Sequence, residues 1–267
     1  MGMIIFVLCA AAAVCLVFSD LIPSWNLINL PVHSTIETLG GISALLIAMV
    51  LLQQKRKTDN ESFYLVGTGF ACMGVLDTFH AMCMPGDAFI FLHSAASLAG
   101  GFFFAGVLLP DKLLLRYRAE QSWIAGLFVL ICFSVGLRAL IFPQDVPMII
   151  RLYDGQFTLA AILLNTCASL FFLVSVPKFY IRYRSTQNTD HLVFLLLALF
   201  FGLAEIIFQY SDTWNDIWWA WHLLRFIAYI MILFFVGKRH FQLAKCFQPN
   251  QSLSPKNSTT MGEAGKQ

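Results

Sequence analysis

Charge is scarce in this sequence. Asp, Glu, Lys and Arg make up only 12% of its 267 residues, whereas 58% are hydrophobic, and the mean hydropathy is +0.73. The single core of a soluble globule cannot bury so many apolar side chains, so the composition excludes a soluble globular protein and indicates an integral membrane protein. The net charge of +2 gives no reason to invoke nucleic acid as a partner.

Two further patterns are missing from the sequence. The apolar runs do not alternate with polar residues at a period of two, and a lipid-exposed strand would leave its backbone unsatisfied, so the runs are predicted to be helices. The seven cysteines show no CxxC spacing and fall mostly within apolar runs, where lone cysteines usually behave as small hydrophobic residues. We therefore predict no disulfide framework.

Eight apolar runs are long enough to cross a hydrocarbon layer of ~30 Å, which takes roughly 17 to 25 residues each. They lie near residues 3–19, 33–53, 62–84, 88–109, 122–142, 157–177, 191–210 and 216–236. The sequence therefore predicts an all-α fold, a polytopic transmembrane helix bundle within residues 1–240, followed by a polar, disordered cytoplasmic tail at residues 241–267. Cleavage of the first run as a signal peptide would leave seven spans, but Met1–Met3 offer no basic residue, which favours a retained helix.

Basic residues follow every second span. They are Lys55, Arg56 and Lys57 after the second span, Lys112, Arg116 and Arg118 after the fourth, Lys178, Arg182 and Arg184 after the sixth, and Lys238 and Arg239 after the eighth. The intervening loops hold few bases, with Arg151 as the exception. By the positive-inside rule, both termini are predicted to be cytoplasmic and the odd-numbered loops to face outward.

Ionisable residues inside the apolar runs gather near one end of the predicted helices. They are His33, Glu37, Asp77, His80, His93, Glu205, His222 and Arg225. With a rise of 1.5 Å per residue, most of them lie roughly 6 to 13 Å below the predicted outer ends of their spans. Charge within a bilayer costs several kcal/mol unless it is paired, liganded or hydrated, so this shared depth predicts a functional site.

Spacing within the helices suggests what the site binds. His33 and Glu37 are four residues apart and Asp77 and His80 are three apart, so each pair lies on one face of its helix. Imidazole and carboxylate groups together are ligands for transition metals. The predicted metal-binding or ligand-binding residues are His33, Glu37, Asp77, His80, His93 and His222, with Glu205 and Arg225 in support. The bound group stays open between zinc, copper, iron and haem.

Several of these residues also have a purely structural interpretation. His33 lies close to the predicted interface and is equally well explained as a hydrogen-bonded interfacial residue. Trp218, Trp219 and Trp221 are most simply an interfacial aromatic belt. Arg138 is expected to extend its guanidinium from the outer end of its span to the interface, and Asn165 to form an interhelical hydrogen bond.

Two more alternatives concern charge and sulfur. Arg225 always carries its charge and needs an anion; Glu205, on the preceding span, is the expected partner, and that pair could be purely structural. The run Met82-Cys83-Met84 beside His80 would suit a soft ion such as Cu(I), although methionine more often fills gaps between side chains.

The motifs that hold these residues resemble a known family. They are His33-Ser-Thr-Ile-Glu37-Thr-Leu-Gly-Gly41, Leu76-Asp77-Thr-Phe-His80-Ala, Phe91-Leu-His93-Ser, Gly100-Gly-Phe-Phe-Phe104 and Trp221-His222-Leu-Leu-Arg225. Together they resemble the MASE-type membrane-associated sensor domains of bacteria over most of residues 30–240. The resemblance implies a polytopic input module in the inner (cytoplasmic) membrane, normally fused on its cytoplasmic side to a histidine kinase or a diguanylate cyclase. This chain ends after the membrane unit, so we expect signalling through such a partner, and assembly as a homodimer stays open.

Two functional hypotheses follow. The first is a non-enzymatic sensor in which a ligand at the outer polar layer changes helix packing, which requires different affinities for two states. The second is an intramembrane zinc hydrolase, similar in residue inventory to the alkaline ceramidase and adiponectin-receptor superfamily, with His80, His93 and His222 as ligands. In that alternative Asp77 is the base. That family carries paired histidines in its last span, whereas His222 stands alone here, which favours the sensor.

Overall fold

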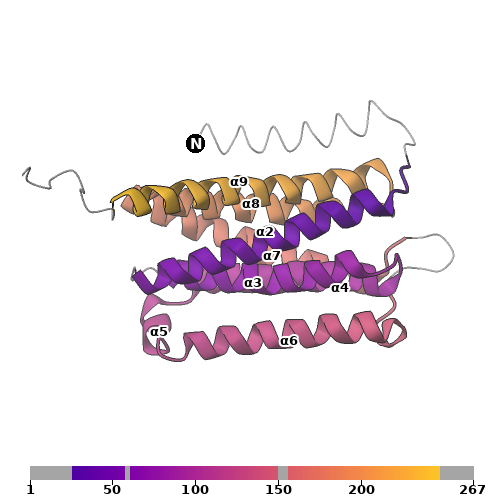
Figure 1. The fold of residues 1–267 in the computed structure, drawn as a ribbon, viewed down its shortest axis with the longest axis horizontal. Helices are drawn as coiled ribbons and strands as arrows, with labels where there is room; N and C mark the ends of the chain where they lie inside the picture. Colours follow the sequence, from indigo (N-terminus) through magenta and orange to yellow (C-terminus); the bar gives the residue numbers. More distant parts are fainter. Residues whose placement is uncertain (1–25, 58–60, 150–155, 247–267) are drawn as a thin grey trace, which may run out of the picture.

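The structure, a computed structural model, describes residues 26–57, 61–149 and 156–246, and these fold into helices joined by short connections (Figure 1). The helices are α2 (Leu30–Lys57), α3 (Glu61–Met82), α4 (Asp87–Ala105), α5 (Asp111–Arg116), α6 (Gln121–Ile141), α7 (Leu159–Thr186), α8 (Thr189–Phe208) and α9 (Asp216–Cys246). Two short 3-10 helices, η1 (Gly106–Leu108) and η2 (Pro143–Asp145), follow α4 and α6. The all-α prediction is confirmed.

Within the described residues, 7 helices are long and apolar enough to cross a membrane by length and composition. They correspond to the second through eighth predicted spans, so the polytopic bundle is confirmed for that part of the chain. The predicted first span at 3–19, Arg151 and the sequence from 247 onward lie outside the described residues. Helix α9 continues to Cys246 and so passes the predicted domain boundary at residue 240.

The long helices run side by side and alternate in direction (Figure 1). The starts of α2, α4, α7 and α9 therefore meet the ends of α3, α6 and α8 at one end of the bundle, on the right in Figure 1. We call this the site end and the other the basic end. Helix α3 packs against α2, α4 and α6, and α2 also packs against α9, whereas α6 lies at the edge of the bundle mainly against α3.

Small residues let α2 and α3 approach closely. A Cβ atom on Gly41 would lie 2.8 Å from Thr78 Oγ1, and one on Gly74 would lie 2.9 Å from the carbonyl oxygen of Gly41. Packing of this kind drives helix association where lipid tails are as apolar as the side chains. The contact fixes the start of α2 beside the end of α3, which carry two of the predicted ligand pairs.

The structure bears on the predictions for two individual polar residues, and it confirms the one for Asn165. Asn165 on α7 donates from Nδ2 to Ser94 Oγ on α4 at 2.8 Å, an interhelical hydrogen bond. The Arg138 side chain is 67% exposed, and its Nη2 lies 2.9 Å from Asp145 Oδ2 at the site end. Arg138 is thus paired at the surface of the bundle and does not contribute to the buried polar layer.

Candidate functional site

All eight predicted ionisable residues are buried at the site end, and none of them is more than 4% exposed. They come from five helices, namely α2, α3, α4, α8 and α9. The shared depth predicted from the sequence therefore corresponds to one contiguous buried layer, which the contacts divide into two groups.

The first group contains His33, Glu37, His80 and His222, which we call the His–Glu cluster. Each residue offers one potential ligand atom, and these four atoms all lie within 4.8 Å of one another. His33 Nε2 is 3.0 Å from His222 Nε2, and His222 Nε2 is 3.5 Å from Glu37 Oε1. Three helices, α2, α3 and α9, thus bring three imidazoles and one carboxyl group to a single point.

Hydrogen bonds at the Nδ1 atoms determine the tautomer of two of these imidazoles. His80 Nδ1 lies 2.6 Å from the carbonyl oxygen of Phe89, and His222 Nδ1 lies 2.7 Å from that of Trp218. A carbonyl oxygen only accepts, so each Nδ1 carries a hydrogen and each neutral ring keeps its lone pair on Nε2. His80 Nε2 is buried with no hydrogen-bond partner in the described structure.

His33 completes this arrangement from α2. Because the lone pair of His222 Nε2 accepts, His33 donates its Nε2 hydrogen across the 3.0 Å contact. The His33 ring also packs against Phe89, with centroids 4.7 Å apart, and against Trp218, at 4.8 Å. His33 is fully buried, so its side chain does not reach solvent as the interfacial interpretation expected.

Two of the three tryptophans, Trp218 and Trp221, line the site. Trp218 is 0% and Trp221 is 1% exposed, so the aromatic-belt interpretation is wrong for both. Ring centroids are 3.5 Å apart between Trp221 and His222 and 3.7 Å apart between Trp218 and His222. Trp221 also contacts the ring of His93, at 4.4 Å. Such a wall keeps water out and lowers the local dielectric constant, which strengthens electrostatic interactions inside it.

The second group, which we call the arginine network, consists of Arg225, Asp77, Tyr229 and His93. Arg225 Nη2 donates to Asp77 Oδ2 at 2.9 Å and to Oδ1 at 3.2 Å, and the Tyr229 hydroxyl donates to Asp77 Oδ2 at 2.8 Å. Arg225 Nη1 lies 3.1 Å from His93 Nε2. Asp77, expected among the ligands or as a catalytic base, is instead the anion that holds Arg225.

The expected pairing of Arg225 with Glu205 is therefore wrong. The reason is the depth of each charged residue along its helix. Asp77 and His80 are three residues apart on α3, as are Arg225 and His222 on α9, and in both helices the charged residue is the deeper one. Because α3 and α9 run in opposite directions, His80 meets His222 in the cluster while Asp77 meets Arg225.

Glu205 lies at the margin of the arginine network. Its Oε1 accepts a hydrogen bond from Ser97 Oγ at 2.6 Å, and its Oε2 is 3.8 Å from His93 Nε2. Glu205 Oε2 has no hydrogen-bond partner among the described residues. Glu205 and His93 thus share the layer with the His–Glu cluster without contributing to its four ligand atoms.

The sequence analysis did not assign four residues to the site that the structure places in contact with it, namely Tyr229, Ser97, Trp218 and Trp221. Tyr229 had a usable signal, because positions 222, 225 and 229 recur at helical spacing on one face of α9. Ser97, four residues after His93, had the same signal on α4. Burial of Trp218 and Trp221 leaves no trace in the sequence, since buried and interfacial tryptophans both occur at helix ends.

The sulfur run does not join the site. Met82 is 61% and Met84 is 74% exposed, and Cys83, although buried, is not among the four clustered ligand residues. The soft-metal alternative based on these three residues is not supported by the geometry.

One comparison with known proteins gives a match. The family model of MASE3, a membrane-associated sensor domain, matches residues 25–239, a region that contains all eight residues of the buried layer. No curated protein and no solved structure matches the chain. The resemblance seen in the sequence motifs is thereby confirmed. With seven candidate membrane spans among its described residues and a match over most of its length, the chain belongs to the MASE3 family of membrane-associated sensor domains.

Proposed function

We propose that this membrane sensor module binds a divalent transition-metal ion at His33, Glu37, His80 and His222, with Zn²⁺ as the first candidate. The observation that carries the proposal is the direction of the imidazoles: His80 and His222 each donate Nδ1–H to a backbone carbonyl and present Nε2 to the cluster. Metal-bound histidines almost always make this outer hydrogen bond, which fixes the tautomer and the ring orientation.

The donor set favours zinc over the other candidates. Three imidazole nitrogens and one carboxylate oxygen suit a four-coordinate zinc ion, whereas Cu(I) prefers sulfur. Haem requires a slot for a planar macrocycle, yet the Nε2 atoms of His33 and His222 are only 3.0 Å apart. The compact packing around them therefore supports a single ion.

Charge balance supports a cation as well. The buried layer contains three carboxyl groups, from Glu37, Asp77 and Glu205, but a single guanidinium, from Arg225. Asp77 is paired with Arg225, so the described layer holds no second guanidinium for Glu37 or Glu205 when either is ionised. An uncompensated charge buried in a membrane protein costs several kcal/mol, and a divalent ion beside Glu37 would reduce that cost.

The helices that supply the ligands suggest how binding is transmitted. Metal binding would draw α2, α3 and α9 together at the site end. The size of this conformational change depends on how much more tightly the ion binds one helix packing than the other. Helix α9 continues to Cys246 at the basic end, which the positive-inside rule places in the cytoplasm. We therefore propose α9 as the output helix toward a cytoplasmic histidine kinase or diguanylate cyclase in the bacterial inner membrane.

The proposal is tested on the detergent-solubilised protein by elemental analysis and an absorption spectrum. The expected result is one zinc ion per chain after zinc loading and desalting, with no Soret band. A Soret band would contradict the single-ion site in favour of haem. Stoichiometric zinc together with lipase or amidase turnover would contradict a non-enzymatic sensor and favour the hydrolase alternative. Absence of zinc from the loaded wild-type protein would contradict the metal site itself.

A further inference from the structure

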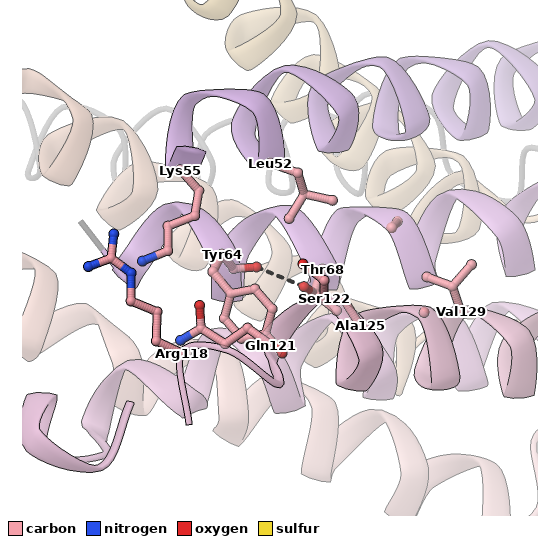
Figure 2. Close-up of a pocket in the computed structure, with 11 residues that line it drawn as sticks. Leu52, Lys55, Tyr64, Thr68, Arg118, Gln121, Ser122, Ala125 and Val129 are labelled. Carbon is pink, nitrogen blue, oxygen red and sulfur yellow. Dashed lines mark hydrogen bonds between the residues drawn. The ribbon is translucent and has the colours of Figure 1, made fainter. Parts of the chain in front are cut away.

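A cavity of about 450 Å³ lies at the basic end between α2, α3 and α6 (Figure 2). This volume falls within the roughly 300 to 1,000 Å³ of typical ligand pockets. Ser122 and Gly126 in its wall are exposed, so the cavity opens at the surface of the bundle. It is separate from the His–Glu cluster, which lies at the site end of the same helices.

The lining changes from charged to apolar along the cavity. Figure 2 shows the cationic groups of Lys55 and Arg118 together at one end, with Val129 at the opposite end. Between them, Tyr64, Gln121 and Ser122 lie toward the charged side. The apolar half of the lining consists of Leu52, Ala71, Ala125, Gly126 and Val129. A ligand that matches this lining has a polar head and an apolar chain.

The charged end is held in place by one carboxylate. Glu61 Oε1 accepts a hydrogen bond from Lys55, and Glu61 Oε2 accepts one from Gln121 Nε2 at 2.6 Å. An ammonium group has three donors, so the pair with Glu61 leaves Lys55 able to donate to a ligand as well. Lys55 and Arg118 are both basic and both line this end of the cavity, which suits a negatively charged head group.

The apolar half has room for a chain because its walls are small. A Cβ atom on Gly126 would meet no atom within 4 Å, and Ala71 and Ala125 contribute only methyl groups. Helix α6 packs mainly against α3 and exposes large apolar side chains such as Trp123, Leu127 and Leu130. The slot between α3 and α6 is therefore open to the acyl chains of the surrounding bilayer.

We propose that this cavity is a binding site for an anionic phospholipid. The phosphate lies between Lys55 and Arg118, and one acyl chain lies over Ala71, Ala125 and Gly126. Basic pockets between transmembrane helices on the cytoplasmic side bind anionic head groups, and the positive-inside rule places this end at the cytoplasmic leaflet. The site does not depend on metal binding.

The test uses the full chain in lipid nanodiscs that contain equal amounts of phosphatidylglycerol and phosphatidylcholine with identical acyl chains. Native mass spectrometry after release from the disc counts the lipids retained on each protein. The wild type is expected to retain one phosphatidylglycerol in preference to phosphatidylcholine. Arg118→Gln should lower that preference about fivefold, because one basic residue near an anionic lipid contributes about a factor of this size. Gly126→Leu should abolish retention of either lipid by filling the slot.

Matched controls come from outside the cavity. Arg184 is an exposed base at the same end of the bundle, and a Cβ on Gly237 of α9 would also meet no atom within 4 Å. Arg184→Gln and Gly237→Leu should retain lipid as the wild type does. The proposal is overturned if the wild type shows no preference for phosphatidylglycerol, if Arg118→Gln changes the preference no more than Arg184→Gln, or if Gly126→Leu retains lipid at the wild-type level.

Discussion

The His–Glu cluster and the arginine network contain similar residues in the same buried layer, yet their hydrogen bonding differs. In the arginine network donors meet acceptors, since Arg225 and the Tyr229 hydroxyl both donate to Asp77. In the His–Glu cluster, acceptors are left over: His80 Nε2 has no partner among the described residues, and a Glu37 oxygen lies 3.5 Å from His222 Nε2, whose lone pair already accepts from His33. Residue type alone does not distinguish scaffold from site, whereas the direction of each hydrogen bond does.

The largest expected effect is on the arginine network. Asp77→Asn removes the anion of Arg225, and a buried cation without its partner should lower the free energy of unfolding by about 3 to 5 kcal/mol. Replacing Arg225 by Met in the same chain should recover part of this loss. Unfolding in mixed micelles, followed by circular dichroism, measures both changes.

The exposed ion pair of Arg138 and Asp145 is the control for this experiment. Its side chains are 67% and 39% exposed, and pairs of this kind contribute roughly 0 to 1 kcal/mol. Equal losses for Asp77→Asn and Asp145→Asn would mean that Arg225 has no special dependence on Asp77.

The next effect concerns the His–Glu cluster. His80→Ala removes a ligand and should weaken zinc binding tenfold or more, measured by competition with a chromogenic chelator. His191 is a matched control, because it is only 5% exposed but lies at the basic end on α8. Unchanged zinc affinity in His80→Ala would remove His80 from the site, and weaker binding in His191→Ala would point to a general loss of structure.

A smaller effect is expected at Tyr229. Tyr229→Phe deletes the hydroxyl that donates to Asp77 at 2.8 Å and should lower the free energy of unfolding by about 1 to 2 kcal/mol. Zinc affinity should not change, because Tyr229 belongs to the network and not to the cluster. Tyr210, which is 73% exposed, provides the control: Tyr210→Phe should leave stability unchanged. Weaker zinc binding in Tyr229→Phe would show that the two groups act as one.

The last variants should not affect stability and test only the orientation of the two ends. Met84 is 74% exposed at the site end, and Arg184 is exposed at the basic end. In a background without native cysteines, a membrane-impermeant maleimide added to cells should label Met84→Cys and not Arg184→Cys. The opposite labelling would reverse the predicted orientation and move the proposed lipid site to the other leaflet.

Much of this fold could be predicted because membrane spans have a strong local signal. The seven described spans and the shared depth of the polar residues follow from apolar run length and from a rise of 1.5 Å per residue. Helical spacing also placed His33 with Glu37, and Asp77 with His80, on common faces.

The division of that layer into two groups could not be predicted from the sequence. Spacing determines which residues share a face of one helix, but not the depth at which that face meets another helix. Pairing Arg225 with Glu205 was reasonable from charge alone, yet in the structure the long side chain of Arg225 on α9 reaches Asp77 on α3. The backbone carbonyl oxygens of Phe89 and Trp218, which orient two imidazoles, have no sequence signal at all.

X-ray absorption spectroscopy at the zinc edge of the zinc-loaded protein tests the central claim most directly. Coordination by His33, Glu37, His80 and His222 predicts four nitrogen or oxygen neighbours at about 2.0 to 2.1 Å, with the outer-shell scattering of several imidazoles. A sulfur neighbour at about 2.3 Å, or a first shell without imidazole, would contradict the assignment of the His–Glu cluster as the metal site.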